Sequence, residues 1–412
     1  MSTSNDDNGD SKTTPVGFTR RQFLPLLGAA AVAATIPRIV SANNSSDRDT
    51  QARARYVYVG TYTAPGTAPG GKRPSTATGI YVFKMNPRDG NLDLVEVVKA
   101  SNPSFLALNP SKTHLYSVNE DEAGRVSAYS INANGTLTFV NTTSASGMHP
   151  CHLSVHPSGQ YLLAANYSSG NMPVFRLLAD GSIGAMTANY QGVGNDTGPN
   201  AGRQEGPHAH QALTDIDGKH VFDVDLGMDR VNVVKLDLAS GKLTPNTVPY
   251  ANVASGAGPR HMAFHPNRKR AYVLNELVSS IDVFNYDPAR GALIWAQTIS
   301  TLPDNFTGSS STAEIRVHPN GRFLYSTNRG HNSIAIYEID SGSGRLRAIG
   351  WEPTRGEWPR GMNIDPSGTF LYVGNQNTDT IAVFRIRSGG DLQASALVRT
   401  PTPVDFEFGA AV

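Results

Sequence analysis

A repeated stretch of sequence constrains the fold of this chain more than any other feature. Six copies begin at Phe105, Cys151, His210, His261, Glu314 and Gly361, and each reads as a strand, a tight turn and a second strand, as in CHLSVHPSGQYLLAANY. A third strand such as RVSAYSI or TIAVFRI and a weaker fourth segment follow each copy. The copies are spaced by roughly 45 to 60 residues, which is the length of a four-stranded propeller blade. The repeat therefore predicts an all-β propeller.

The two ends of the chain together supply one more blade. Residues 55–62, RYVYVGTY, resemble a second strand, and residues 79–85 and 92–98 resemble a third and a fourth, but no first strand precedes them. Residues 403–408, PVDFEF, can provide that strand, and joining the first and last blades removes the sheet edges that an open ring would expose. We expect seven blades of four antiparallel strands, closed by the C-terminal strand, in a single domain over residues 55–412.

The composition fits a chain with many tight turns and no highly charged partner. It contains 40 Gly and 26 Pro, and only 17% of its residues are charged. A net charge of +1 gives no reason to expect nucleic acid or an acidic membrane surface as a partner. The sole cysteine, Cys151, excludes an internal disulfide, and no cofactor motif occurs. We expect a monomer that needs no cofactor.

Residues 1–42 resemble a twin-arginine export signal. A pair of arginines at positions 20–21 stands ahead of an apolar run over residues 23–36, and small residues ending at Ala42 follow it. The apolar run is shorter than the roughly 20 residues that a membrane helix needs, so no membrane span is expected in the mature protein. We expect cleavage near Ala42, a linker over residues 43–54, and a periplasmic or secreted product.

The strand order of a blade assigns each polar residue to one of two faces. The start of the first strand and the end of the second lie on one face, which we call the near face, and the turn between them lies on the far face. His156, His265 and His318 stand beside proline in these turns, so we expect them to be structural residues of the far face. In contrast, the following histidines stand at or just before first strands: His149, His152, His208, His210 and His261.

Ionisable residues gather on the near face. Besides the His, Glu and Arg residues discussed below, the strand starts, strand ends and adjoining loops contribute His149, Glu205, His208, Asp225, Glu314 and Arg360. Because first strands line the central channel, these side chains are expected around one mouth, where they would bind a substrate. Any single one could instead be structural, since strand-end polar groups commonly cap turns and an inward carboxylate commonly pairs with a nearby arginine.

Longer phrases of the sequence resemble a known family. GRQEGPHAHQ, GAGPRHMAFHPN, YVLNELVSSIDVF and PRGMNIDPSGTFLYVGNQNTDTIAVF are similar to phrases of the seven-bladed propeller lactonases, typified by 6-phosphogluconolactonase of the propeller type. The resemblance covers nearly everything after residue 55, and it implies hydrolysis of a sugar lactone without a metal. The family includes fungal carboxy-muconate lactonizing enzymes, whose proposed site of one His, one Glu and two Arg falls in this sequence on His210, Glu276, Arg260 and Arg329. Arg360 could take the place of Arg329.

These residue types suit lactone hydrolysis. Either His210 or Glu276 can be the base that activates water, and Arg260 and Arg329 are forked, permanently charged donors for an oxyanion, a carboxylate or a phosphate. With a pKa near its ordinary value, His210 would titrate around pH 6 to 7. No GxSxG sequence is present, so we interpret Cys151 as a small buried side chain and not as a nucleophile.

Several alternatives remain open at the level of sequence. His208 and His210 face the same way in a strand, but two histidines do not complete a metal site. The same His, Glu and Arg set could close a muconate into a lactone, which is an isomerase reaction, or the ring could be a non-enzymatic binding module. Phosphorylated sugar intermediates are cytoplasmic, so the export signal favours a non-phosphorylated aldonolactone as the small-molecule substrate.

Overall fold

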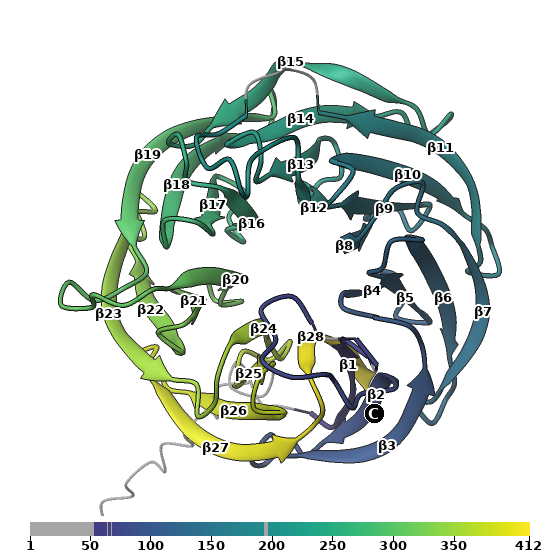
Figure 1. The fold of residues 1–412 in the computed structure, drawn as a ribbon, viewed down its shortest axis with the longest axis vertical. Helices are drawn as coiled ribbons and strands as arrows, with labels where there is room; N and C mark the ends of the chain where they lie inside the picture. Colours follow the sequence, from purple (N-terminus) through teal and green to yellow (C-terminus); the bar gives the residue numbers. More distant parts are fainter. Residues whose placement is uncertain (1–52, 64, 67, 193–196) are drawn as a thin grey trace, which may run out of the picture. The chain divides into compact units, whose positions relative to one another are not determined.

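A computed structural model describes residues 53–63, 65–66, 68–192 and 197–412. The predicted export signal and most of the predicted linker lie outside the described residues. Within these ranges the chain forms 28 strands in seven four-stranded sheets, which surround a central axis in Figure 1. The described residues include no helix that is long and apolar enough to cross a membrane. The predicted all-β, seven-bladed propeller is confirmed.

Each blade consists of four antiparallel strands, named in order from the axis outward. Blade one contains β28 (Pro403–Ala411), β1 (Arg55–Thr61), β2 (Gly79–Met85) and β3 (Leu92–Lys99), and blade two contains β4 (Leu106–Leu108), β5 (His114–Asn119), β6 (Arg125–Ile131) and β7 (Leu137–Ser144). Blade three contains β8 (Pro150–Val155), β9 (Tyr161–Asn166), β10 (Asn171–Leu177) and β11 (Ile183–Gln191), and blade four contains β12 (Ala209–Thr214), β13 (Val221–Asp225), β14 (Arg230–Leu236) and β15 (Leu243–Asn252). Blade five contains β16 (Pro259–Phe264), β17 (Arg270–Asn275), β18 (Ser280–Asp287) and β19 (Ala292–Ser300), and blade six contains β20 (Ser311–Val317), β21 (Phe323–Arg329), β22 (Ser333–Ile339) and β23 (Leu346–Pro353). Blade seven contains β24 (Pro359–Ile364), β25 (Phe370–Asn375), β26 (Thr380–Ile386) and β27 (Leu392–Arg399).

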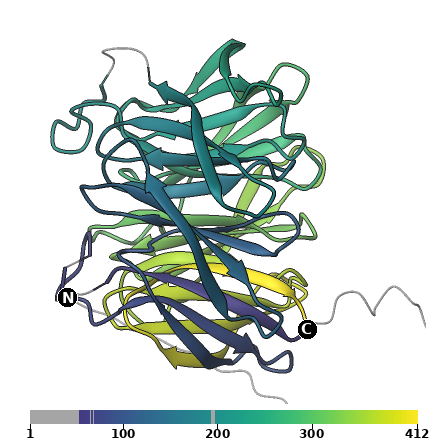
Figure 2. The ribbon, with the colours of Figure 1, turned by 90° about the vertical axis from the view of Figure 1, so that its right-hand side faces the viewer.

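The hydrophobic core lies between neighbouring blades. Every residue of the second strand β9 is buried, whereas the outermost strand β27 has one buried residue, and its other residues are exposed or partly buried, alternating in its second half. A strand that is covered on both faces needs a continuous apolar run, and an outer strand covered on one face needs only alternation. Figure 2 shows the ring turned by 90°, with its strands running between the two faces. The ends of the strands, and the loops that join them, therefore form both faces.

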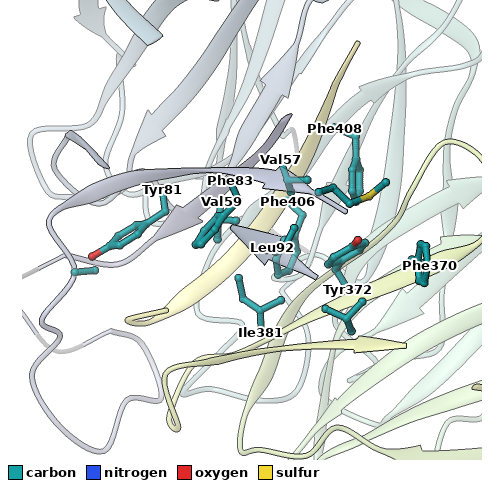
Figure 3. Packing of buried hydrophobic residues seen from close by; sticks show 13 residues of the cluster. Val57, Val59, Tyr81, Phe83, Leu92, Phe370, Tyr372, Ile381, Phe406 and Phe408 are labelled. Carbon is teal, nitrogen blue, oxygen red and sulfur yellow. The ribbon is translucent and has the colours of Figure 1, made fainter. Parts of the chain in front are cut away.

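The C-terminal strand closes the ring as predicted. β28 pairs with β1 in antiparallel register, with Val57 opposite Phe408 and Val59 opposite Phe406. In Figure 3, these side chains pack with Phe370 and Tyr372 of blade seven in one buried cluster. The C-terminal strand therefore completes the sheet of blade one, and its side chains fill the core between blades one and seven. This removes the exposed edges that an open ring would have.

Three histidines of the far-face turns each link their blade to the next one. The Nε2 atoms of His156, His265 and His318 lie 2.8, 2.8 and 2.9 Å from the carbonyl oxygens of Gly218, Gly321 and Gly368. All three glycines have a positive φ, which glycine adopts without strain. Since Nδ1 of His265 accepts a backbone N–H of its own turn, Nε2 carries the proton and donates it to the carbonyl. The prediction that these histidines are structural is confirmed.

A second set of links between blades was not predicted from the sequence. Tyrosines of the second strands donate their hydroxyl to a backbone carbonyl of the next blade, as Tyr116 does to Gly181 at 2.9 Å and Tyr325 to Gly390 at 2.9 Å. Tyr372 donates to the carbonyl of Gly90 at 2.8 Å, and this bond joins blade seven to blade one. Burying a hydroxyl without a partner would be unfavourable, so each bond satisfies the tyrosine while it aligns two blades.

Candidate active site

A β-bulge recurs where the innermost strands begin on the near face. Between β12 and β13, Ala209 pairs with Asp225 and Gln211 with Val224, which leaves His210 without an opposite residue. The same shift of register leaves the equivalent residue unopposed in three other blades, namely Cys151, Arg260 and Arg360. A bulge bends the strand and re-aims the side chain of the extra residue. The bulges therefore present these four side chains at equivalent positions around the axis.

A cavity of about 510 Å³ lies at this near-face mouth. Five of the residues predicted to form the site are in its lining: His149, His210, Glu276, Arg329 and Arg360. The lining also includes Glu120, Cys151, Tyr167, Ser168, Arg203, Ser311, Trp358, Pro69 and Gly70. Residues from all seven blades thus meet around one space. Figure 1 shows the innermost strands of the blades arranged around the central axis.

Three arginines surround the carboxylate of Glu276, which follows β17. Nη2 of Arg203 lies 2.6 Å from Oε1, while Nη2 of Arg329 and Nε of Arg260 lie 2.8 and 3.1 Å from Oε2. Burial alone would raise the pKa of Glu276, but the charges of Arg329, Arg203 and Arg260 outweigh burial and hold the pKa well below its ordinary value. Glu276 is therefore ionised at neutral pH and is a poor proton acceptor.

His210 is the buried imidazole beside this carboxylate. Its Nε2 atom lies 4.0 Å from Oε2 of Glu276, and its Nδ1 atom lies 3.6 Å from Sγ of Cys151. Burial, followed by the charges of Arg260 and His261, lowers the pKa of His210 well below its ordinary value. This corrects the expectation of titration around pH 6 to 7, since the cationic form is disfavoured. His210 is neutral at pH 7 and can accept a proton.

Arg260 lies behind the mouth and does not line the cavity. It is 4% exposed, and besides Glu276 it donates to the carbonyl oxygen of Ala313 and contacts the ring of His261. Burial lowers the pKa of Arg260, although its two carboxylate neighbours act in the opposite direction. Its Nη1 atom is engaged by the carbonyl of Ala313, and its Nε atom faces Glu276, so both atoms contribute to the surroundings of that carboxylate. The expected role of Arg260 as an oxyanion donor stays a prediction.

Four other residues expected at the mouth are absent from the cavity lining, and each of them has protein partners. Asp225 accepts the backbone N–H groups of His208 and Met228, and Glu314 accepts a hydrogen bond from Arg316 and contacts Nδ1 of His261. His208 stacks on the ring of Tyr167 with a centroid distance of 4.4 Å, and Glu205 is bound to His208 Nε2 at 3.1 Å. The sequence placed these residues on the correct face, but it did not reveal these pairings.

The structure adds residues to the mouth that the sequence analysis did not select. Arg203 comes from the loop before β12 and contacts both Glu276 and the hydroxyl of Tyr167. Trp358 precedes β24 with φ of 62°, at the position that Gly258 occupies before β16, also with φ of 62°. A signal existed in the sequence, because EWPRG aligns with GAGPRH and places a bulky aromatic residue where the other blade has glycine. Residues in this left-handed region cluster at functional sites.

A larger cavity of about 620 Å³ lies elsewhere, against the outer strands β11 and β15. Its lining contains Tyr190, Tyr250, Arg230 and Lys242 but no carboxylate and no histidine. Opening an ester bond needs a group that accepts a proton from water, and this lining provides none at neutral pH. The residue types of the two linings therefore favour the near-face mouth as the candidate active site. Within the described ranges, no three His, Cys, Asp or Glu side chains form a group that could hold a metal ion.

The fold and the mouth together define a class of protein. A seven-bladed propeller that directs a neutral histidine, a clamped glutamate and several arginines into one cavity is a propeller enzyme equipped for acid–base hydrolysis. The family model for "Lactonase, 7-bladed beta-propeller" matches residues 56–408. The chain belongs to this lactonase family, which confirms the resemblance found in the sequence and the expectation of an enzyme.

Individual relatives agree with this assignment. The 6-phosphogluconolactonase of Bacillus subtilis is 39% identical over 315 residues, which cover 76% of this chain and 85% of the relative. A 6-phosphogluconolactonase of Formosa agariphila is 33% identical over 317 residues, 75% of this chain and 86% of its own length. Among solved structures, a periplasmic gluconolactonase of Pseudomonas aeruginosa superimposes with a TM-score of 0.80 at 29% identity, covering 87% of this chain and 100% of that one.

Proposed function

We propose that this lactonase hydrolyses a lactone of the gluconolactone type at the near-face mouth, with His210 as the general base. The observation that carries the proposal is the pairing of a buried, neutral His210 with an ionised Glu276 at 4.0 Å inside the cavity. The relatives named as gluconolactonase and 6-phosphogluconolactonase support this substrate class. A neutral imidazole that lines the cavity can take a proton from water and later return it.

In the proposed reaction, a water oxygen attacks the lactone carbonyl carbon while His210 accepts the proton of that water. The carbonyl oxygen becomes an oxyanion, and Arg329, which lines the cavity, has donors beyond those it uses for Glu276 and the carbonyl of Thr312. The ring C–O bond then breaks, and the departing alkoxide takes the proton from the imidazolium of His210. The product is the open-chain aldonic acid, and the enzyme is regenerated.

Glu276 has two roles in this proposal. Its carboxylate stabilises the imidazolium that forms on His210 in the transition state, and it fixes the guanidinium groups of Arg203 and Arg329 at the mouth. The low pKa of Glu276 argues against the alternative in which this carboxylate is itself the base, because a strongly stabilised carboxylate has little tendency to accept a proton.

A hydrolysis screen of the purified protein tests the proposal. Glucono-δ-lactone, its 6-phosphate and a muconolactone would be offered to the wild type, and the acid released would be titrated at constant pH. His210→Asn should lower kcat by about 100-fold or more, since general-base catalysis contributes about that much. His265→Asn, which removes an imidazole from the far face, is the matched control. Hydrolysis that survives His210→Asn, or no hydrolysis of any gluconolactone, would contradict the proposal.

We also propose that the enzyme acts outside the cytoplasm. The twin-arginine-like pattern over residues 1–42 supports this location, and so does the similarity to a protein named periplasmic gluconolactonase. Fractionation of cells that produce the full chain should place it in the periplasm or the medium. Replacing the arginines at positions 20–21 by lysines should retain it in the cytoplasm, and unchanged export of that variant would contradict twin-arginine transport.

A further inference from the structure

A long connection of blade one contributes to the cavity of the candidate active site. The connection between the second and third strands comprises residues 62–78 in blade one, but only residues 167–170 in blade three and 376–379 in blade seven. In Figure 1 it extends from β1 toward the central axis, and its residues Pro69 and Gly70 line the cavity. Connections of this length without secondary structure are uncommon in compact domains and are usually functional. We call residues 68–73 the blade-one loop.

Contacts with blade seven hold the blade-one loop in place. The side-chain amide of Gln376 donates to the carbonyl oxygen of Pro69 at 3.0 Å, and that of Asn377 donates to the carbonyl oxygen of Gly70 at 3.1 Å. The same two blades are joined by two ion pairs at the surface, Lys72–Glu357 and Arg73–Asp379. Exposed ion pairs contribute little, but hydrogen bonds to successive backbone carbonyls fix the path of the loop. The loop therefore has a defined position beside the mouth.

Gly70 of this loop packs against the indole ring of Trp358. A methyl group at Gly70 would lie 2.5 Å from Cζ2 of Trp358, which is much closer than two carbon atoms approach without a bond, and Gly70 has a φ of 72°. The Nε1 atom of Trp358 is buried and has no hydrogen-bond partner among the described residues. The position of the indole ring therefore depends on packing against the loop and not on a hydrogen bond of its own.

The indole ring in turn contacts the guanidinium of Arg329. The Cζ atom of Arg329 lies 5.6 Å from the centroid of the Trp358 ring, which is within the range of a cation–π interaction. Arg329 donates to Glu276 and to the carbonyl oxygen of Thr312 through the same atom, Nη2, whereas its Nε atom is buried without a hydrogen-bond partner among the described residues. Two bonds from one nitrogen hold one corner of the guanidinium and leave its plane free to turn. The contact with the indole ring restricts that plane.

We propose that the blade-one loop is a positioning element for Arg329. Gly70 holds the indole ring of Trp358 against the guanidinium, and the ring fixes the direction in which the free N–H groups of Arg329 point. The inference rests on the proposed function, in which Arg329 stabilises the oxyanion. A displacement of about 1 Å far from the reacting atoms can lower a rate by about 100-fold. The loop can therefore control kcat without a contact of its own to the reacting carbonyl.

Gly70→Ala tests the role of the loop. The added methyl group displaces either the loop or the indole ring, so kcat for an accepted lactone should fall by about 10- to 100-fold, while KM should change less than about 3-fold because the oxyanion exists only in the transition state. Gly159→Ala is the matched control, since Gly159 also has a φ of 72° but a methyl group there would meet nothing closer than Pro110 at 3.7 Å. Equal kcat in the two variants, or a loss confined to KM, would overturn the proposal.

Substitutions of Trp358 test the contact with Arg329. Trp358→Phe keeps an aromatic face beside the guanidinium and Trp358→Leu removes it, while both keep a side chain at the same backbone position. Trp358→Leu should lower kcat by about 10-fold or more, and Trp358→Phe by less than about 3-fold. Equal losses in the two variants would overturn the proposal.

A measurement without turnover separates this inference from the proposed function. The chain has three tryptophans, so replacing Trp295 and Trp351 by phenylalanine leaves Trp358 as the only indole. In that background, Gly70→Ala should shift the emission maximum to longer wavelength, because the ring becomes more exposed, and Gly159→Ala should not. Lactone hydrolysis by the wild type together with unchanged emission in Gly70→Ala would overturn this inference alone. Absence of hydrolysis together with shifted emission would overturn the proposed function and the role of Arg329 in it, but would support the contact between the loop and the indole ring.

Discussion

The Nε2 atom of His210 lies 4.0 Å from the Oε2 atom of Glu276, and both side chains are almost completely buried. At this distance the two groups are not hydrogen-bonded, and the charge of Glu276 favours an imidazolium against burial and the charges of Arg260 and His261, which keep His210 neutral in the resting enzyme. The carboxylate therefore offsets part of the cost of the imidazolium that forms in the transition state. An interaction with a charge that is present only in the transition state is the kind that lowers a reaction barrier.

The pH dependence of the reaction should reflect the lowered pKa of His210. The neutral imidazole is the active form, so activity is lost as the pH falls through the pKa of the folded enzyme. Since burial places that pKa well below its ordinary value, kcat/KM should remain level between pH 6 and 7 and fall only at more acidic pH. A pH-rate profile on any accepted lactone checks this, and an acidic limb centred near 6.5 would contradict it.

Glu276→Gln should reduce stability as well as activity. The substitution removes the negative charge from among Arg203, Arg260 and Arg329, two of which are almost fully buried. Breaking a buried ion pair in this way costs about 3 to 5 kcal/mol, because the remaining charges have no compensation. Denaturant unfolding measures the change.

The control for this substitution is a carboxylate of a largely exposed ion pair. Glu338→Gln removes the partner of Arg347 at the surface, where an ion pair contributes at most about 1 kcal/mol. Equal free energies of unfolding for the two variants would show that the arginines around Glu276 do not depend on its charge.

Cys151 should behave as an inert neighbour of His210 and not as a nucleophile. It is 6% exposed, and burial raises the pKa of its thiol far above neutrality, so the thiolate is scarce. Iodoacetamide at pH 8 should leave activity intact, and Cys151→Ala should lower kcat less than about 10-fold, against about 100-fold for His210→Asn. Mass spectrometry of the treated protein would verify that the thiol is unmodified, and rapid inactivation with labelling of Cys151 would contradict this account.

Removing one aromatic ring from the closing strand should destabilise the whole propeller. Phe406 of β28 is fully buried in the cluster between blades one and seven, and Phe406→Ala should cost about 3 to 5 kcal/mol. Leu397→Ala on β27 is the control, since Leu397 is 55% exposed. Thermal unfolding compares the two variants, and a melting temperature of Phe406→Ala as high as that of the control would mean that the closure contributes little.

The sequence specified the ring, its closure and the sorting of residues between two faces. Blade length, apolar second strands and Gly-containing turns are local patterns, and they predicted β28 beside β1 and the far-face position of His156, His265 and His318. The face of a residue at a strand end follows from strand direction alone. For that reason, the sequence alone assigns the polar residues at strand starts and strand ends to the near face.

Only the tertiary structure decided which of these residues face the cavity. Arg260 and Arg360 both follow a proline near the start of an innermost strand, and each is the extra residue of the equivalent bulge in its own blade. The local sequence therefore does not distinguish them. In the folded ring, Arg260 meets the carboxylate of Glu276 at 3.1 Å and becomes part of the protein's own ion-pair cluster, whereas Arg360 lies over the ring of Tyr62 and forms no ion pair with any described residue. Their difference comes from the residues that neighbouring blades bring near them, and those contacts join segments far apart in the chain, so no local pattern records them.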